Sequence, residues 1–395
     1  MRLLRIGVSV IALTALAAIQ AGAAPKTMMM KAPSGPPVTV GVILSMTGPY
    51  APLGEPERNA INLAEKDINA HGGVHGRPIK FDIVDDEGKA DTAQQLATQM
   101  VGRKVAMIIG ASLTPTSRVI ARVANDAKIA HIFMTPTQDI WNTKNGVLKY
   151  TFEVTPRNEI EAEKLAGFIK NRLGKKRIAV LHDDQQYGTV GGGIFSAEAK
   201  RQGLEIVADD QYAPTATDVT AQLGKVRAAN ADTIVIWTAS PAAALIVRQA
   251  RQLGLHTDIV GSTGIVSGNF LRVAKSDGFG VYADQDIDLT YPGREQKAFI
   301  TAYRGAYNIE PVNFASFAWD AAHIAAMALS GTKIGDGDAL AHWLATMKPY
   351  RGTTGEFRFT ESDHNGLSAS DIRIVRDNPK AGTDGEWRTL PASQQ

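Results

Sequence analysis

The sequence predicts an α/β protein with two separate parallel β-sheets, each covered by helices. Short apolar segments rich in β-branched residues alternate with amphipathic helical segments, a pattern typical of parallel sheets that are covered on both faces. This alternation runs through residues 38–134 and restarts at Arg177, which indicates two sheets rather than one. The length of 395 residues also suits two domains.

The first 23 residues have the pattern of a secretion signal. Arg2 and Arg5 form a positive end, residues 6–19 form an apolar middle, and Ala21-Gly22-Ala23 offers a small-residue cleavage site. We expect cleavage after Ala23. The alternative is an uncleaved membrane anchor, for which the apolar run is short. Residues 24–37 are expected to form a flexible leader.

The composition excludes several classes of function. Cleavage of the signal removes Arg2 and Arg5, so the 42 basic residues fall to 40 and equal the 40 acidic ones. A near-neutral chain without a basic stripe does not fit a nucleic-acid partner. Because cysteine is absent, disulfides, lipid-modified cysteine and thiol chemistry are excluded. Export without disulfides suits a bacterial periplasm and a chain large enough to bury its own core.

The first run is expected to contain four strands with helices between them. The strands are predicted at 38–45, 79–84, 105–109 and 129–134. Residues 48–54, GPYAPLG, contain two prolines and two glycines and are expected to form a loop. Helices are predicted at 55–70, at 91–101 and after Gly110-Ala111, where apolar residues recur with helical spacing.

The second run is expected to contain five strands and three helices, followed by three further helices and a tail of short strands. The strands are predicted at 178–181, 204–208, 233–237, 258–260 and 281–284. The helices are predicted at 192–202, 219–228 and 242–253, and then at 294–307, 314–329 and 337–347. Alternating apolar and polar residues within 355–375 predict strands in the tail.

One strand–helix junction has the features of an anion site. After the strand at 105–109, Gly110-Ala111 is expected to turn the backbone, Thr114 to cap a helix, and Pro115 to occupy its first position. A helix N-terminus offers free backbone N–H groups and partial positive charge. Hydroxyls surround it, on Ser112, Thr114, Thr116 and Ser117. The junction therefore predicts a seat for a carboxylate; an ordinary capped helix that binds nothing is the alternative.

Other strand ends in both runs also carry hydroxyls, amides and aromatic rings. In open α/β sheets, ligands bind beyond the carboxyl ends of the strands. A cleft between two lobes would bring these ends together. The candidate residues are Tyr50, Leu53, Ser112, Leu113, Thr114, Thr137, Gln138, Asp139, Gln186, Tyr187, Ala239, Ser240 and Thr263.

Several segments together resemble a known family. They are VTVGVILSMTGPYAPLG from Val38, a helix ending DINAHGGVHGRPI, the turn DDEGKAD, HDDQQYG, and RQARQLGL in the second half. In this order, behind a signal peptide, they are similar to the branched-chain amino-acid (leucine/isoleucine/valine) type of periplasmic substrate-binding protein. The resemblance covers residues 38 to about 378.

The resemblance implies a type I periplasmic-binding-protein fold with two lobes and three chain crossings at the hinge. The first lobe is expected at 38–157 plus 287–367, and the second at 158–286 plus 368–392. The lobes would close over a small carboxylate, and the closed form would dock on an inner-membrane ABC permease. Such a protein is periplasmic and not an enzyme. No cofactor, metal or catalytic residue is expected, and a monomer suits lobe closure.

The resemblance also implies roles for single residues. The family's ligand-carboxylate site falls on Leu113 and Thr114, with Thr114 as a hydroxyl donor. Further contacts fall on Thr137, through its backbone, and on Asp139. Tyr187 matches the family's cleft tyrosine in the segment QQYG.

Departures from the family pattern bear on the ligand. Amino-acid binders hold the ligand's ammonium with a carboxylate at the position of Thr263, which cannot carry charge. Ala239 stands where a second cleft tyrosine is expected, and Leu53 where a tryptophan is common. An aromatic or α-keto organic acid, which has no ammonium, is therefore favoured. In the alternative, Asp139 holds the ammonium of an amino acid; Asp139 could also be a helix cap or a salt-bridge partner.

The remaining signals favour structural roles. His182, Asp183 and Asp184 are adjacent at a strand end, so their side chains point in different directions and do not suit a metal site. Residues 191–193, three glycines, lack the spacing of a dinucleotide-binding loop and are expected to form a flexible helix entry. Trp237 is expected in the core. An enzyme, or a periplasmic sensor subunit on the same fold, remains the alternative function.

Overall fold

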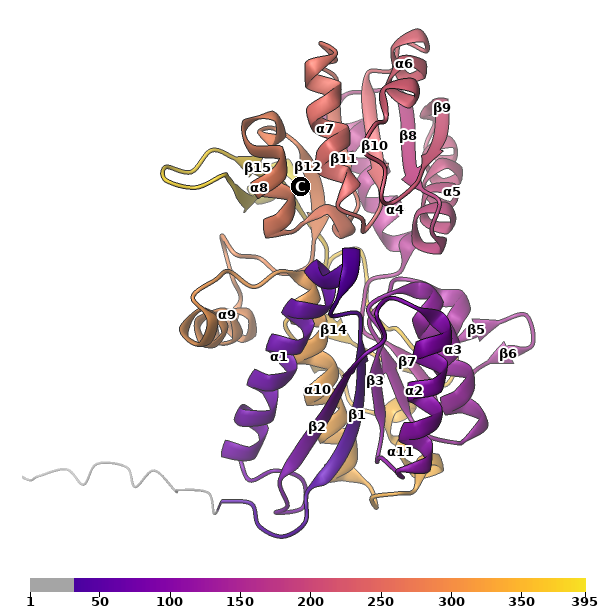
Figure 1. The fold of residues 1–395 in the computed structure, drawn as a ribbon, viewed down its shortest axis with the longest axis vertical. Coiled ribbons are helices and arrows are strands. Elements are labelled where there is room, and N and C mark those ends of the chain that lie inside the picture. Colours follow the sequence, from indigo (N-terminus) through magenta and orange to yellow (C-terminus); the bar gives the residue numbers. More distant parts are fainter. Residues whose placement is uncertain (1–31) are drawn as a thin grey trace, which may run out of the picture.

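The computed structural model describes residues 32–395 and forms two lobes, one above the other along the long axis (Figure 1). Each lobe has its own β-sheet, and the predicted architecture of two helix-covered, mostly parallel sheets is confirmed. The predicted signal and the first part of the leader lie outside the described residues. Within residues 32–395, no helix is both long and apolar enough to cross a membrane.

The first lobe contains a five-stranded sheet of order β2-β1-β3-β4-β7, in which every neighbouring pair is parallel. Its strands are β1 (Val38–Leu44), β2 (Ile79–Asp85), β3 (Ile108–Gly110), β4 (His131–Phe133) and β7 (Thr151–Glu153). The carboxyl ends of these strands therefore meet at one edge, which faces the second lobe.

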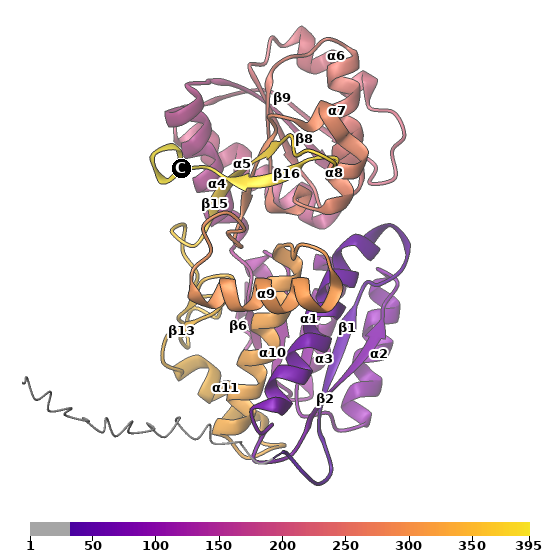
Figure 2. The same ribbon diagram turned by 90° about the vertical axis from the view of Figure 1, so that its left-hand side faces the viewer.

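Two helix layers cover this sheet because alternate residues of a strand point to opposite faces. Val40 and Val42 pack with α1 (Ala51–Ala70) and α10 (Asn313–Gly331). Ile43 packs with α2 (Ala90–Gly102) and α3 (Thr114–Asp126). The later chain adds α9 (Arg294–Tyr307), α11 (Gly337–Thr346), β13 (Tyr350–Arg351) and β14 (Glu356–Phe357) to this lobe (Figure 2). A short hairpin, β5 (Asn142–Thr143) and β6 (Gly146–Val147), projects from it.

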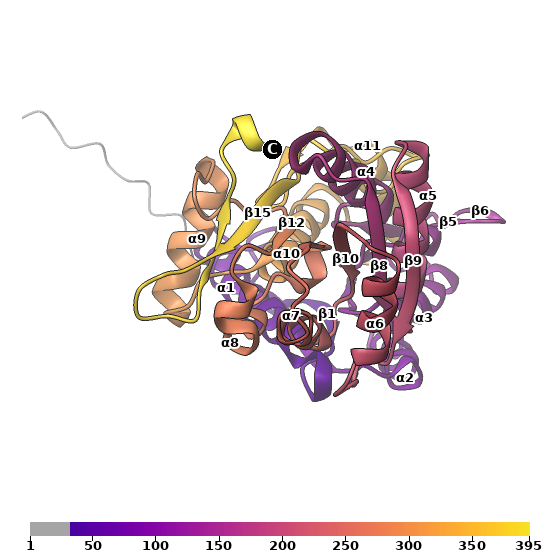
Figure 3. The same ribbon diagram turned by 90° about the horizontal axis from the view of Figure 1, so that it is seen from above.

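The second lobe contains a seven-stranded sheet of order β16-β15-β12-β11-β10-β8-β9. Its parallel strands are β8 (Arg177–Asp183), β9 (Glu205–Tyr212), β10 (Thr233–Trp237), β11 (Asp258–Gly261) and β12 (Tyr282–Gln285). Two antiparallel strands, β15 (Arg373–Asn378) and β16 (Glu386–Thr389), extend it beyond β12 (Figure 3). The end of the chain thus completes the second lobe.

Helices also cover both faces of the second sheet. On one face, Leu165 of α4 (Asn158–Phe168) and Phe195 of α5 (Gln186–Arg201) pack on Val180 and Val235. On the other, α6 (Thr220–Ala228), α7 (Ala242–Gln252) and α8 (Gly268–Ala274) pack on residues such as Leu181. The chain passes between the lobes after β7, after β12 and between β14 and β15.

The sequence misplaced the start of two helices. The loop expected at 48–54 is wrong, because α1 already begins at Ala51. Pro52 lies in its first turn, where a missing N–H leaves no helical hydrogen bond unmade. Gly54 is required there, since a side chain would overlap the carbonyl of Ser45. Helix α5 likewise begins at Gln186, so the expected helix start at Gly192 is six residues late.

The three glycines of α5 are therefore interior helix residues rather than a flexible entry. Gly191 lies against the indole of the buried Trp237, and Gly192 lies against His182. Gly193, in contrast, is exposed with open space beside it. These glycines let α5 approach the sheet closely. Elements with weaker sequence patterns, namely β7, α4, α8 and β16, were not predicted.

We predict that Gly191→Ala lowers the free energy of unfolding by about 1–3 kcal/mol, because the added methyl group overlaps the Trp237 indole. Gly193→Ala is the matched control on the same helix. It is expected to be neutral or to stabilise by about 0.5–1 kcal/mol, since alanine is the better helix former. Urea unfolding of both variants measures the difference, and equal effects would contradict close packing at Gly191.

Candidate functional site

A cavity lies between the lobes, where the carboxyl ends of the two sheets face each other. The space there is about 420 Å³, including the part that is open to solvent. Both lobes line it, through Leu53, Ser112, Leu113, Thr114, Met134, Thr135, Pro136, Thr155, Glu161, Tyr187, Ala239, Thr263, Gly264, Phe314 and Phe317. Its wall is mostly apolar, and none of these residues is basic. The cavity therefore suits a small ligand with few polar groups.

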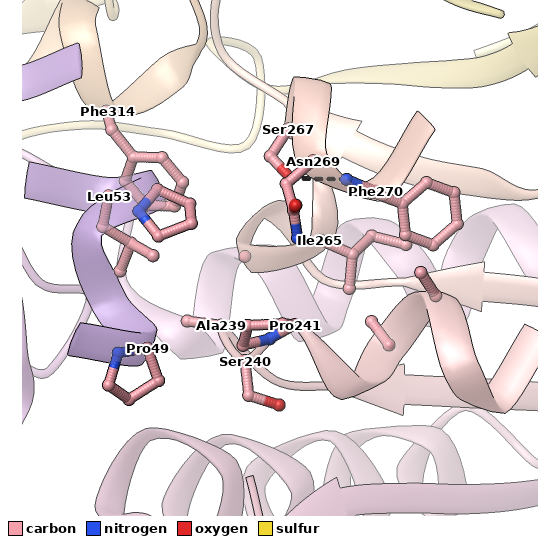
Figure 4. Close-up of a pocket in the computed structure, with 14 residues that line it drawn as sticks. Pro49, Leu53, Ala239, Ser240, Pro241, Ile265, Ser267, Asn269, Phe270 and Phe314 are labelled. Carbon is pink, nitrogen blue, oxygen red and sulfur yellow. Dashed lines mark hydrogen bonds between the residues drawn. The ribbon is translucent and has the colours of Figure 1, made fainter. Parts of the chain in front are cut away.

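A second pocket of about 340 Å³ adjoins this cavity and shares four residues with it. Figure 4 shows Pro49, Leu53 and Phe314 of the first lobe facing the second lobe across this pocket. On the opposite side are Ala239, Ser240, Pro241, Ile265, Ser267, Asn269 and Phe270. Leu53, Ala239, Gly264 and Phe314 thus separate the inner cavity from the outer pocket.

The start of α3 forms one wall of the cavity. The helix begins at Thr114, and Leu113 is the N-cap residue, whose side chain makes no capping hydrogen bond. The prediction that Thr114 caps the helix is therefore wrong. Its hydroxyl instead lies 3.0 Å from the Thr137 hydroxyl. Because the first N–H groups of a helix have no intrahelical acceptor, they stay available to an anion.

Close packing fixes the turn before α3. Gly110 has a φ of +127°, and a side chain there would overlap the carbonyl of Ile43. The Gly110 carbonyl is hydrogen-bonded to the ring Nε2 of buried His131. The Ser117 hydroxyl accepts from the backbone N–H of Ala111 at 3.1 Å. These contacts hold the start of α3 at the end of the sheet.

The Ser112 hydroxyl lines the cavity but is already used within the protein. It donates to the carboxylate of Glu57 and accepts from the backbone N–H of Ser45 at 3.0 Å. Glu57 is fully buried in α1, and burial raises the pKa of its carboxyl well above the ordinary value. Ser112 therefore positions the turn, and the ligand contact that the sequence predicted for it stays a prediction.

Three predicted contacts, Thr137, Gln138 and Asp139, are not among the residues that line the cavity. Thr137 is buried behind the wall and contacts it through Thr114. The Asp139 side chain is 57% exposed and accepts a hydrogen bond from Arg118 at 2.8 Å. Gln138 begins the short helical turn Gln138–Ile140. Asp139 is thus a salt-bridge partner in this structure and does not line the cavity.

Tyr187, Ala239 and Thr263 of the second lobe reach the cavity from three elements. Tyr187, in the first turn of α5, donates from its hydroxyl to Oε2 of Glu161 at 3.3 Å. The Thr263 hydroxyl accepts from the side-chain amide of Asn313 at 2.6 Å. Because Asn313 belongs to the first lobe, this hydrogen bond joins the two lobes across the cavity.

Tyr50 and Ser240 lie farther out, beyond the inner cavity. Ser240 lines the adjoining pocket, and its hydroxyl accepts from Thr238 at 2.9 Å. Tyr50 ends the short helical turn before α1 and lines neither pocket. Burial, together with the charges of Asp183 and Asp184 in the second lobe, raises the pKa of its hydroxyl to about 12. Ser240 therefore faces the cleft from its outer part.

The sequence missed part of the cavity wall. Phe314 and Phe317, which the sequence placed in a helix without assigning them to the cleft, reach the cavity from α10. Glu161 reaches it from α4, which had no clear apolar periodicity and was not predicted. The sequence signal that could have identified Glu161 was a charged residue soon after the point where the chain first passes between the lobes. Trp237 lies in the core as expected.

Comparisons with known proteins point in one direction. The family model described as periplasmic binding protein matches residues 37–382. The Leu/Ile/Val-binding protein homolog 3 of Brucella melitensis is 24% identical over 337 residues, which cover 85% of this chain and 90% of that protein.

Two solved structures illustrate the range of similar folds. The branched-chain amino-acid transporter substrate-binding protein LivJ of Streptococcus pneumoniae, in complex with isoleucine, has a TM-score of 0.77 and 25% identity, covering 90% of this chain and 99% of its own. A solute-binding protein of an ABC transporter from Rhodopseudomonas palustris, in complex with 3,4-dihydroxybenzoic acid, has a TM-score of 0.78 and 22% identity, covering 89% and 96%.

We predict that His131 makes stability depend on pH. Burial lowers the pKa of its imidazole to about 4, from an ordinary value near 6.5. Since the unfolded chain then binds the proton more readily, stability is complete above pH 6.5 and falls as the pH drops toward 4. Between pH 7.5 and pH 5.5, the free energy of unfolding of the wild type should fall by about 1.4 kcal/mol more than that of His131→Gln. Glutamine keeps a hydrogen-bond donor but does not titrate.

Urea unfolding of both proteins at pH 7.5 and pH 5.5 measures this difference. The comparison between the two proteins cancels the contribution of other titrating groups. A difference in unfolding free energy that stays constant between the two pH values would contradict a depressed pKa at His131.

Proposed function

The chain belongs to the periplasmic binding protein family, and we propose that it captures a small carboxylate between its two lobes and delivers it to an inner-membrane ABC permease. The observation that carries this proposal is the start of α3 in the wall of a mostly apolar cavity between the lobes. A carboxylate would accept hydrogen bonds from the free N–H groups there and gain from the partial positive charge of the helix.

The proposal includes closure of the lobes about the three chain crossings. Residues 38–157 and 287–367 would move as one body, and residues 158–286 and 368–392 as the other. Contacts that bridge the lobes support this, namely Asn313 with Thr263 and Arg118 of α3 with Gln186 of α5. Because Thr263 also lines the cavity, ligand binding and closure would stabilise each other.

Two classes of ligand are compatible with a carboxylate seat. The sequence favoured an aromatic or α-keto organic acid, and the fold is shared with a protein that binds 3,4-dihydroxybenzoic acid. The names of several relatives, such as an amino acid binding protein of Pseudomonas aeruginosa, favour an amino acid. In both classes the ligand's carboxylate would lie at the start of α3. The classes differ in the chemical group of the ligand that would reach the second lobe.

The proposal also covers location and assembly. The N-terminal pattern supports export through a cleaved signal and residence in the periplasm. A monomer would leave both lobes free to close.

A thermal-shift screen of the mature protein tests the proposal. Ligands that bind the folded state raise the melting temperature by mass action. The panel contains L-amino acids in one set and aromatic and α-keto carboxylates in the other. A melting temperature that no carboxylate raises would contradict the proposal. Ligand recovered unchanged after incubation would distinguish a binding protein from an enzyme, and capture of a signalling receptor in place of a permease would favour a sensor subunit.

We predict that Thr114→Ala weakens binding of the carboxylate by about 1 kcal/mol, or roughly fivefold, through loss of a charge-assisted hydrogen bond. Thr114→Ser keeps the hydroxyl and is expected to retain most of the affinity. Calorimetric titration with a ligand found in the screen measures both variants. Unchanged affinity in Thr114→Ala, with its melting temperature also unchanged, would remove Thr114 from the carboxylate site.

A further inference from the structure

Among the described residues that line the cavity, Glu161 is the only acid. It belongs to the first turn of α4, where the partial positive charge of a helix N-terminus favours a carboxylate. Its side chain is fully buried, although α4 carries other acids that are exposed. A buried acid in a binding cavity requires a partner, because an isolated charge is costly away from water.

The hydrogen bonds of Glu161 are incomplete. Oε2 accepts from the Tyr187 hydroxyl at 3.3 Å. Oε1 is shielded from solvent and has no hydrogen-bond partner in the part of the chain that the structure describes. Buried polar atoms are nearly always paired in folded proteins. A ligand that donates a hydrogen bond to Oε1 would complete the arrangement.

The charged groups that shift the pKa of Glu161 are all acidic. Burial raises the pKa of its carboxyl well above the ordinary value, and the carboxylates of Asp284, Asp286 and Glu153 raise it further. Asp284 is itself fully buried on β12, and neither of its carboxylate oxygens has a partner among the described residues. Lys164 acts on Asp284, and no cation is among the groups that shift Glu161. The described residues that line the cavity include no basic side chain that could pair with Glu161.

The two other positions where an acid could have held a cation do not offer one to the cavity. Asp139 is bound by Arg118 outside the cavity wall. Thr263, at the position where the family resemblance predicts the acid, cannot carry charge, and its hydroxyl accepts from Asn313. Glu161 is thus the carboxylate in place to meet a cationic group of the ligand.

We propose that Glu161 determines specificity by pairing with an ammonium group of the ligand, while the start of α3 holds its carboxylate. The ligand is then a zwitterion, and its remaining atoms face apolar residues such as Leu53, Met134 and Phe317. This inference rests on the proposed function. It reverses the preference for an organic acid, which had depended on the apparent absence of an acid in the cavity.

Pairs of ligands that differ only in the ammonium group test the inference. Each L-amino acid is titrated beside its 2-oxo and 2-hydroxy analogues, and γ-aminobutyrate beside butyrate. In the pair that binds, the compound with the ammonium is expected to bind at least about tenfold more tightly than its analogue. The 2-oxo analogue and butyrate offer Glu161 no hydrogen-bond donor, and the 2-hydroxy analogue offers it a donor but no positive charge. This comparison uses the wild-type protein and does not depend on the folding of a variant.

Glu161→Gln then assigns the selectivity to one residue. Glutamine has nearly the same shape but cannot become negative, so affinity for the amino member should fall at least about tenfold. Affinity for the analogue without the ammonium should change little. Glu153→Gln is the matched control, because Glu153 is equally buried, bonds to the Trp141 indole at 2.8 Å and does not line the cavity.

The outcomes separate the inference from the proposed function. Binding of organic acids alone would overturn the role of Glu161 and leave the carboxylate receptor standing. Amino-acid binding that survives Glu161→Gln, or that is lost equally in Glu153→Gln, would also overturn it. If neither set of ligands binds, the proposed function fails, and the inference fails with it.

Discussion

The unsatisfied N–H groups at the start of α3 are the constraint on which the cleft depends. A helix cannot satisfy its own first N–H groups, and a parallel sheet brings such helix starts to one edge. In the first lobe, Gly110 allows the chain to pass close to Ile43, and buried His131 and Ser117 hold the turn. The local backbone thus presents donors to the cavity without any basic side chain.

Buried carboxyl groups surround this site and give it a distinct electrostatic character. Glu57 lies behind the start of α3, and Glu161 and Asp284 lie on the side of the second lobe. Burial raises the pKa of all three. Such groups weaken the folded state unless they are paired, and they are often retained at functional sites. Because these carboxyl groups lie beside the cavity, we link their unfavourable effect on folding stability to recognition of the ligand.

The predicted site residues and the observed cavity wall overlap in part, for reasons that follow from helix boundaries. Leu113, Thr114 and Tyr187 line the cavity because each lies within four residues of a strand end, which local patterns identify well. Asp139 lies outside because Arg118, one turn into α3, reaches it. Glu161 was missed because the charged first turn of α4 has no clear apolar stripe. A contact between residues distant in sequence cannot be read from local periodicity.

The sequence by itself determined the alternation of strands and helices, the two sheets and the family resemblance. These depend on the spacing of apolar residues, which is a local property. Only the tertiary structure decided which polar groups remain free at the cleft. Ser112 is engaged by Glu57, Thr263 by Asn313 and Asp139 by Arg118, whereas Oε1 of Glu161 has no partner among residues 32–395. Hydrogen-bond partners depend on the packing of distant segments, so chemical availability is settled only when the chain has folded.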